Sequence, residues 1–398
     1  MSLRILIAPS GFKESLEADE VADCIATGIL RALPDATIQK APLVDGGEGF
    51  TKALVGATGG SLHSLTVTGP TGQPVESHFG FLGGEGTKTA VLEMAAAAGL
   101  RLVPPNARNP LLTTTYGVGE LIKAALNAGA ERILVGCGDS GTNDGGAGMA
   151  QALGVRLLDA SGQELAHGGN ELMRLASIDL RDRDPRLEQV QIDVACNWHN
   201  LLCGPKGVAR VFGPQKGASP ETVEQLATAL DRYAAVIERD LGINVGEMPG
   251  SGASGGLGTG LHALLGATLY PRYEIVMQYL ELDSLLQNTD LVITAEGSID
   301  FQTPRGKIPV EVAQRAKRHN LPVIAIAGSI GEDARINFDH GIDSFSTILK
   351  EPCTLPEAIS NACDLLTYAA ERVMRLILVG QQLNQASQPA PQLVTSKS

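Results

Sequence analysis

Apolar residues recur along the chain in two alternating patterns. Short runs of aliphatic residues each end at glycine or small polar residues, and these runs span residues 4–8, 133–135, 291–294 and 323–327. A helical pattern follows each run; after the first run, Val21, Ile25 and Ile29 recur at helical spacing. Strands that alternate with helices indicate a parallel sheet, whose ligands bind beyond the carboxyl ends of its strands. We therefore expect an α/β fold in which the loops after these runs converge.

Residues 61–93 follow a different pattern. Three β-rich segments alternate apolar and polar positions there, separated by Gly-Pro-Thr-Gly and Gly-Gly-Glu-Gly turns. A chain of 398 residues is also too long for one typical hydrophobic core. We therefore expect a second, mixed α/β domain. Residues 379–398 lack an apolar period and are rich in Gln, Pro and Ser, so we expect this tail to be disordered.

The composition excludes several classes of protein. The formal net charge is −13 and only 4% of residues are aromatic, which disfavours a nucleic-acid surface of basic patches and stacking rings. No apolar run is long enough to span a membrane, and residues 1–7 look like the opening of a strand rather than a signal peptide. We expect a cytoplasmic protein without a nucleic-acid or membrane partner. Its six cysteines are scattered, so we expect reduced thiols and no disulfides.

Two glycine-rich loops are the strongest candidates for ligand binding. The first, residues 135–148, follows an apolar run, and the second, residues 249–258, precedes an apolar helical stretch. Glycine lets a backbone approach a ligand closely, and amides at the start of a helix donate to phosphate or carboxylate. We expect both loops to bind the phosphates of a nucleotide. The candidate residues are Gly138, Ser140, Thr142, Asn143, Gly145, Gly146, Gly252, Gly255 and Gly256.

Other interpretations of these loops stay open. Gly136-x-Gly138-x-x-Gly141 follows a predicted strand, with Asp159 after the next apolar run, as in a dinucleotide fingerprint. Against it, Asp139 inside the turn would face a pyrophosphate without a metal. The first loop could also be a tight turn without a ligand, and the second a flexible linker. The G-x-x-x-x-G-K-[ST] motif of a P-loop does not occur in the sequence.

Charged side chains beside glycines supply the remaining candidate chemistry. Lys13, Lys216 and Lys307 lie in glycine-bearing loops, where a compact ammonium can reach phosphate. Carboxylates in such loops suit Mg²⁺, which takes one or two carboxylates together with substrate phosphates. These carboxylates belong to Asp45, Glu48, Asp144, Glu296 and Asp300. The alternative role for Asp144 is to cap a helix.

A zinc site is a further alternative. Cys196, His199 and Cys203 have the side-chain chemistry of zinc ligands, but no fourth ligand stands at a standard spacing. The other interpretation is that Cys196 is a buried cysteine at the end of a strand.

In order along the chain, these motifs resemble those of the type I glycerate kinases. The resemblance runs from residue 4 to residue 376. It is carried by Ala8-Pro-Ser-Gly-Phe-Lys-Glu-Ser15, Asp45-Gly-Gly-Glu-Gly49, Glu93-Met-Ala-Ala-Ala-Ala-Gly99, Thr113-Thr-Thr-Tyr-Gly-Val-Gly-Glu-Leu-Ile122, Ser140-Gly-Thr-Asn-Asp-Gly-Gly-Ala-Gly148, Phe212-Gly-Pro-Gln-Lys-Gly-Ala218, the cluster at Pro249 and Gly306-Lys307. The resemblance implies transfer of a phosphoryl group from ATP, with Mg²⁺, to a hydroxyl of D-glycerate, with 2-phosphoglycerate as the favoured product.

The resemblance also implies how the chain is divided. A flavodoxin-like or Rossmann-like parallel-sheet domain would combine residues 1–58 with residues 286–378. An inserted mixed α/β domain would span residues 59–285 and carry the glycine-rich loops. The oligomeric state stays open, a homodimer included.

Roles for single residues follow from the loops and the resemblance together. We expect a lysine to neutralise the charge of the transferred group and a carboxylate to orient the acceptor hydroxyl. The catalytic candidates are Lys13, Asp45, Lys216 and Asp300, and the metal candidates are Asp144 and Glu296.

Three positions depart from the family pattern. Asn197 stands where similar kinases have an aspartate, Asp139 where they have glycine, and Ser298 where they have arginine. Asp139 could replace the lost acid in space, or the substrate could have changed. A kinase for another small hydroxy acid and a nucleotide-binding protein without kinase activity are therefore alternative functions.

Overall fold

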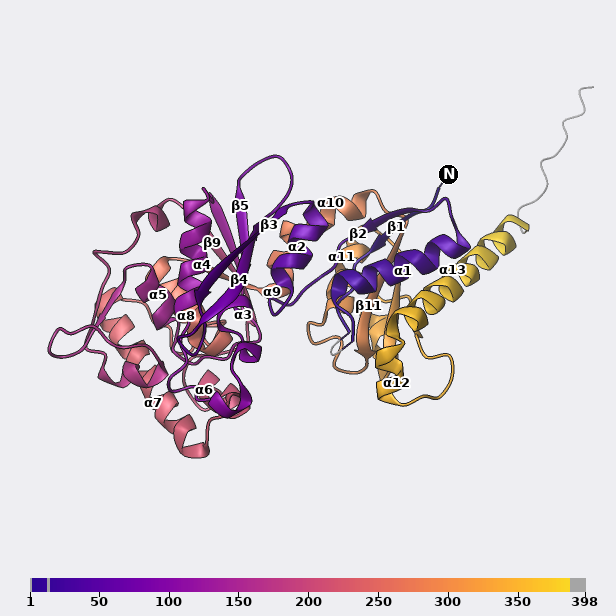
Figure 1. Ribbon diagram of the computed structural model, residues 1–398. Coiled ribbons are helices and arrows are strands. Elements are labelled where there is room, and N and C mark those ends of the chain that lie inside the picture. The colour runs from indigo at the N-terminus through magenta and orange to yellow at the C-terminus, as the bar shows by residue number, and fades with distance from the viewer. Residues whose placement is uncertain (1, 13–14, 387–398) are drawn as a thin grey trace, which may run out of the picture. The chain divides into compact units, whose positions relative to one another are not determined.

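The computed structural model describes residues 2–12 and 15–386, which form two compact units (Figure 1). Unit 1 is built from both ends of the chain, up to residue 43 and from residue 282 onward. Unit 2 is the continuous segment between them, residues 44–281. Among the described residues, no helix combines the length and the apolar character that crossing a membrane requires.

Unit 1 contains a five-stranded sheet in which neighbouring strands run parallel. The strand order is β2-β1-β11-β12-β13. β2 lies on one side of β1, and β11, β12 and β13 follow on the other side. This reversal creates a topological switch point at the carboxyl ends of β1 and β11. The strands are β1 (Arg4–Ile7), β2 (Thr37–Lys40), β11 (Leu291–Ile299), β12 (Val323–Ile330) and β13 (Ser344–Thr347).

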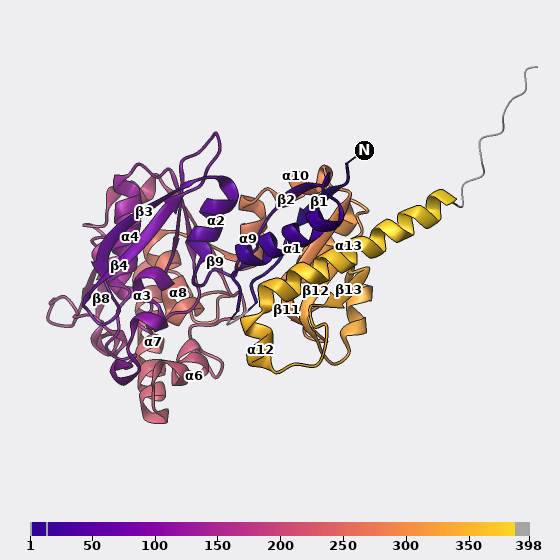
Figure 2. The ribbon, with the colours of Figure 1, turned by 45° about the vertical axis from the view of Figure 1, so that its right-hand side comes forward.

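The first and last helices of unit 1 lie side by side on one face of this sheet (Figures 1 and 2). They approach closely because Gly28 has no side chain: a Cβ there would lie 2.2 Å from the carbonyl oxygen of Thr367. The helical segments of unit 1 are α1 (Ala18–Ala32), α10 (Leu282–Gln287), α11 (Ile308–Arg318), η6 (Ala334–His340), α12 (Leu355–Ser360) and α13 (Ala362–Ala386).

A disulfide joins these two helices. It connects Cys24 of α1 to Cys363 of α13, with their Cα atoms 5.6 Å apart. The expectation that all cysteines are reduced is therefore wrong for this pair. The two cysteines are separated by 339 residues, so their proximity follows from helix packing and left no signal in local spacing.

Unit 2 contains a six-stranded mixed sheet of order β10-β9-β6-β5-β4-β3. The four strands from β10 to β5 are parallel, and β4 and β3 add an antiparallel edge. The alternating pattern at residues 61–93 forms this edge and β5. The strands are β3 (Ser61–Thr68), β4 (Pro74–Phe81), β5 (Thr89–Glu93), β6 (Arg132–Gly136), β9 (Gln191–Cys196) and β10 (Thr268–Pro271), with a separate hairpin of β7 (Arg156–Leu158) and β8 (Ser177–Asp179).

Helices cover the sheet of unit 2 and share one apolar core with it. The α-helices are α2 (Phe50–Thr58), α3 (Ala95–Ala98), α4 (Tyr116–Asn127), α5 (Ala147–Ala152), α6 (Val208–Phe212), α7 (Pro220–Leu241), α8 (Ala253–Leu265) and α9 (Arg272–Tyr279). Short 3₁₀ turns are η1 (Leu100–Leu102), η2 (Pro105–Ala107), η3 (Gly169–Arg174), η4 (Pro185–Glu188) and η5 (Pro214–Lys216).

The limits of the units differ from the expected domain limits. Residues 44–58, assigned from the sequence to the terminal domain, belong to unit 2, because α2 packs on β3, β4 and β5. Residues 282–285 belong to unit 1. Helix α13 continues to Ala386, so residues 379–386 of the expected disordered tail are helical. The remainder of that tail, residues 387–398, lies outside the described residues.

Candidate active site

The carboxyl ends of the parallel strands of unit 2 place several polar side chains at one edge. The register pairs Gly136 of β6 with Ala195 of β9, and Cys196 of β9 with Pro271 of β10. Asp139, Asn197 and Arg272 therefore all follow neighbouring strand ends. Ligands of open α/β sheets bind beyond this edge.

The loop at residues 44–49 packs against the same edge. A Cβ at Gly46, whose φ is 85°, would lie 3.0 Å from the carbonyl oxygen of Ala195 and 3.2 Å from the amide nitrogen of Cys137. A Cβ at Gly138 would lie only 2.6 Å from the Cα of Gly47. Backbone thus touches backbone here, and the loop carries Asp45 to the strand ends.

Two carboxylates flank Gly47. Asp139 Oδ2 accepts a hydrogen bond from the amide of Glu48 at 2.9 Å, and Asp45 Oδ1 accepts from the amide of Gly47 at 3.2 Å. Arg272 lies on the other side of Asp45, with Nη1 3.4 Å from Oδ2. Asp139 has a left-handed φ of 49°. The set combines negative and positive charge at the carboxyl ends of neighbouring strands.

The two glycine-rich loops converge, as expected, but they pack mainly on each other. The amide of Gly145 donates to the carbonyl oxygen of Gly255 at 3.1 Å, and a Cβ at Gly256 would lie 2.9 Å from the Cα of Gly145. Ser254, Gly255 and Gly256 all have left-handed φ values, which break the regular geometry of α8. These glycines permit the contact between loops, which accounts for them without a ligand.

Burial separates the predicted nucleotide-binding residues into two groups. Gly138 is half-buried at the strand end. The others, which are all buried, are Ser140, Thr142, Asn143, Gly145, Gly146, Gly252, Gly255 and Gly256. Within the described chain, Thr142 Oγ1 and both amide atoms of the Asn143 side chain have no hydrogen-bond partner. Buried polar atoms without partners are costly, so these are the atoms that a ligand or water would satisfy.

The first two glycines of the dinucleotide pattern lie close to other residues of the chain. A Cβ at Gly136 would lie 2.6 Å from the ring of Phe50, and one at Gly138 would meet Gly47. Close contacts within the chain therefore account for these two glycines without a dinucleotide.

Asp144 is a buried capping residue. Its Oδ2 accepts from the amide and hydroxyl of Thr115, both at 2.8 Å, and from the amide of Gly148 at 3.3 Å, while Oδ1 accepts from the amide of Gly146 at 3.2 Å. Burial raises the pKa of this carboxyl, although these hydrogen bonds oppose the shift. Both oxygens are directed at protein donors, so Asp144 does not fit the expected role of a Mg²⁺ ligand, and the capping alternative describes its geometry.

Lys216 is buried and donates hydrogen bonds to the first glycine-rich loop. Its Nζ donates to Ser140 Oγ at 2.8 Å and to the carbonyl oxygen of Thr142 at 2.6 Å. Desolvation lowers the pKa of Lys216 to about 7, with partial compensation from the charge of Asp144. The ammonium therefore contacts the loop itself.

The lowered pKa of Lys216 should make stability depend on pH. Between pH 7 and pH 10 the unfolded chain binds a proton at Lys216 that the folded chain does not, so stability should rise with pH. Relative to the Lys216→Met variant, the wild type should gain on the order of 1 kcal/mol per pH unit. Urea unfolding of both proteins at pH 6, 7, 8 and 9 measures this difference. A difference that is constant across the four values would contradict the lowered pKa of Lys216.

A second group of candidate residues lies at the switch point of unit 1. Ser10 donates through its amide and its hydroxyl to the carbonyl oxygen of Ala295, which joins the loop after β1 to β11. Lys307 Nζ lies 3.6 Å from Asp300 Oδ1 and 3.8 Å from Glu296 Oε2. The structure thus brings Glu296 and Asp300 together around one lysine. Lys13 lies outside the described residues.

The zinc alternative has no support in the structure. Cys196 Sγ lies under Gly250, where a Cβ would approach it to 2.8 Å, and Cys203 Sγ points to the carbonyl oxygen of Leu230. Across residues 2–12 and 15–386, no three His, Cys, Asp or Glu side chains gather as a metal site.

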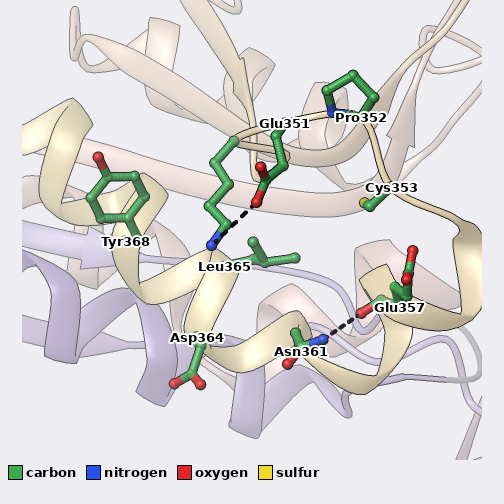
Figure 3. A pocket seen from close by; sticks show the side chains of 9 residues that line it. Glu351, Pro352, Cys353, Glu357, Asn361, Asp364, Leu365 and Tyr368 are labelled. Atoms are coloured by element: carbon green, nitrogen blue, oxygen red, sulfur yellow. Dashed lines mark hydrogen bonds and ion pairs between the residues drawn. The ribbon is translucent and has the colours of Figure 1, made fainter.

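Two open pockets lie away from the candidate residues. One of about 820 Å³ is lined by the loop after β13 and by α12 and α13, and contains the ion pair of Lys350 with Glu351 (Figure 3). Another of about 520 Å³ lies at the amino-terminal ends of β5 and β6, beside Thr89 and Arg132. None of the predicted site residues lines either pocket, and we assign neither a function.

Sequence reasoning passed over Arg272, and it considered Asp139 only as a replacement for the acid that is absent at Asn197. Arg272 is a single arginine after a proline, with no surrounding motif, so only the strand register reveals its position. A left-handed aspartate after a strand could have been suspected at Asp139, because glycines surround it.

Comparison with known proteins gives a consistent result. A model of the glycerate kinase family matches residues 5–378. The chain is 49% identical to the glycerate kinase of Haemophilus influenzae, covering 94% of this chain and 99% of that protein. It is 46% identical to the glycerate 2-kinase of Escherichia coli, covering 96% and 99%. A crystal structure assigned to glycerate kinase 2 of Salmonella typhimurium LT2 is similar with a TM-score of 0.85 and 48% identity, covering 96% and 100%.

Proposed function

The chain belongs to the glycerate kinase family, and from that premise we propose that it transfers a phosphoryl group from ATP to a hydroxyl of D-glycerate, giving 2-phosphoglycerate. The observation that carries the proposal is similarity over nearly the whole chain to several glycerate kinases. The geometry supports it, because carboxylates and a cationic side chain gather at the carboxyl edge of each parallel sheet. Phosphoryl transfer depends mainly on such positioning and charge.

In unit 2, we assign the phosphates of ATP to the first glycine-rich loop. Gly138 is half-buried at the strand end, and the unpartnered side chains of Thr142 and Asn143 can donate to phosphate oxygens. Lys216 acts through Ser140 and Thr142, so we propose it as a positioning residue. Gly145, Gly146, Gly255 and Gly256 act by packing one loop on the other, and Gly252 packs on the backbone of Leu201.

In unit 1, Glu296 and Asp300 fit a magnesium ion that also binds phosphate oxygens. Both carboxylates lie within 4 Å of Lys307 Nζ, and Mg²⁺ takes one or two carboxylates with substrate phosphates. When bound, the ion would neutralise part of the phosphate charge. Lys13, in the loop after β1, is our candidate to contact the transferred group. Asp45 of unit 2 is our candidate to orient the acceptor hydroxyl.

The wider expectations of the sequence are part of the proposal. The strand order of unit 1 is β2-β1-β11-β12-β13, so β2 lies on one side of β1 and the three later strands lie on the other. This order supports a flavodoxin-like unit. We also propose a cytoplasmic enzyme whose partners are ATP and a small hydroxy acid.

Phosphorus NMR of a reaction with D-glycerate, ATP and Mg²⁺ tests the function. We expect consumption of ATP and a phosphomonoester signal that matches 2-phosphoglycerate, and none with L-glycerate. A thermal-shift comparison should show stabilisation by ATP with Mg²⁺ and not by NAD, because only a bound ligand stabilises by mass action. ATP that persists unchanged beside D-glycerate would contradict the proposal.

A second candidate is a kinase for a different small hydroxy acid. It is favoured by the amide at Asn197 and by Ser298, where the resemblance leads one to expect an acid and an arginine. A panel of hydroxy acids, screened by ADP release, separates the two candidates. The better acceptor is the one with the higher kcat/KM.

A further inference from the structure

We propose that Arg272, Asp139 and Asp45 form the acceptor subsite, in which Arg272 binds the carboxylate of the hydroxy acid and Asp139 binds a hydroxyl group. The inference rests on the proposed function and specifies which residues recognise its acceptor. It concerns unit 2 alone.

The guanidinium of Arg272 is available to a substrate. Its contact with Asp45 is long, at 3.4 Å, whereas other arginines of unit 2 contact carboxylates at 2.6 Å, as Arg132 does with Asp193 and Arg186 with Asp184. Arg272 also lies over the ring of Tyr273, with Cζ 4.6 Å from the ring centroid. Its side chain is 29% exposed. The ring of Tyr273 and the contact with Asp45 thus orient the guanidinium, which keeps N–H donors for a further partner. A planar guanidinium binds a carboxylate through two parallel hydrogen bonds.

Asp139 occupies a backbone conformation that suits glycine better. Its φ is 49°, and its carboxylate is exposed at the strand end, held through Oδ2 by the amide of Glu48. Within the described residues, Oδ1 receives no hydrogen bond. A side chain kept in a left-handed conformation, with one oxygen left for another donor, is suited to contact a hydroxyl.

Gly47 preserves the space between the two carboxylates. Its φ is not left-handed, so conformational freedom does not require glycine here. A Cβ would lie 2.2 Å from Asp139 Oδ2 and 3.2 Å from Asp45 Oδ1. The absence of a side chain therefore fixes where the carboxylate of Asp139 can lie.

The charges of this set match a hydroxy acid. A hydroxy acid that accepts the phosphoryl group carries one carboxylate and neutral hydroxyl groups. Two aspartates alone would repel the carboxylate, and Arg272 supplies the attraction that offsets this repulsion. A neutral polyol needs only the aspartates. Loss of Arg272 should therefore affect an acid much more than a polyol.

Steady-state kinetics with both substrates tests the role of Arg272. In Arg272→Gln, KM for D-glycerate should rise by about tenfold or more, while KM for ATP stays within about twofold, because one charged hydrogen-bonded contact to the acid is lost. The rate with glycerol, offered as an acceptor that lacks the carboxylate, should not fall. Arg272→Lys should be intermediate, since it keeps the charge and loses the fork. Arg101→Gln is the matched control; this exposed arginine pairs with Glu48, and its loss should change neither KM by more than about twofold.

The variant Asp139→Gly separates an effect on catalysis from an effect on folding. Asp139→Gly should keep or raise the melting temperature, because it relieves the left-handed side chain, yet kcat/KM for D-glycerate should fall by about tenfold or more. Gly47→Ala should lower kcat/KM in the same direction by displacing the carboxylate. Adding Asn197→Asp to Asp139→Gly should recover part of the loss, because Asn197 follows the neighbouring strand β9 and its Oδ1 already accepts from the amide of His199.

Equilibrium binding keeps the two proposals distinguishable. Calorimetric titration with D-glycerate should show binding to the wild type and affinity weaker by about tenfold or more for Arg272→Gln, whether or not ATP is turned over. Binding through Arg272 without turnover would support the subsite and contradict the kinase. Turnover with an unchanged KM for D-glycerate in Arg272→Gln, an equal rise in both KM values, or wild-type kcat/KM in Asp139→Gly would each overturn the subsite. If Asn197→Asp recovers no activity in the Asp139→Gly variant, the ends of β6 and β9 do not belong to one subsite.

Discussion

Gly255→Ala should destabilise the protein more than any other single methyl group added to the glycine-rich loops. The new Cβ would lie 1.9 Å from the carbonyl oxygen of Thr142 and 2.7 Å from its carbonyl carbon, and both are backbone atoms that cannot rotate away. The φ of 72° adds left-handed strain. Together these effects should cost about 4 kcal/mol or more, the range in which single substitutions become exceptional. The midpoint of urea unfolding measures the change.

Gly266→Ala is the matched control for this variant. Gly266 ends α8 with a similar φ of 77°, but nothing lies within 4 Å of a Cβ there. Its replacement should cost only about 1 kcal/mol, the conformational part of the penalty. Equal losses in the two variants would show that the contact between the loops is not tight.

Asp144→Ala should unfold unit 2 rather than merely inactivate it. The change removes an acceptor that serves two groups of Thr115 and the amides of Gly146 and Gly148, and leaves them buried without a partner. The expected cost is about 3–5 kcal/mol, as for the loss of one partner of a buried charged group. Urea unfolding and kcat should be measured on the same preparations.

The same variant separates capping from metal binding. If Asp144 caps the start of α5, activity should follow the folded fraction and recover with a stabilising osmolyte. If Asp144 binds Mg²⁺, activity should fall while the unfolding midpoint stays unchanged, and excess Mg²⁺ should restore part of it. Full stability with no activity would therefore contradict the structural role.

The alternation of strands and helices was predictable from the sequence because burial on both faces imposes continuous apolar runs. The runs at residues 4–8, 133–135, 291–294 and 323–327 correspond to β1, β6, β11 and β12. Within unit 1, the loops after β1, β11 and β12 follow the same edge, because these strands are parallel, whereas β6 belongs to the separate sheet of unit 2. The family was also predictable, because its motifs are local and occur in order.

The roles of the glycines were harder to predict, since composition does not reveal what a backbone approaches. Gly145, Gly255 and Gly256 suggested a phosphate cradle, yet they meet one another. The same limit applies to Asp144, whose neighbours in sequence are glycines but whose donors include Thr115. Arg272 could not be predicted as a site residue because no motif surrounds it. Its position follows from the pairing of β9 with β10.

The construction of unit 1 from both ends of the chain has a consequence for biosynthesis. Ile5 of β1 pairs with Leu291 of β11, and Cys24 bonds to Cys363, so β1 and α1 cannot complete their contacts until the last quarter of the chain has been made. At about 5–20 residues per second, synthesis of the intervening segment takes on the order of 10 s or more. Unit 2, which is continuous, can fold in that interval. During that time the apolar faces of β1 and α1 lack β11 and α13 as packing partners. A nascent chain that stalls after unit 2 would expose these faces to chaperones and proteases.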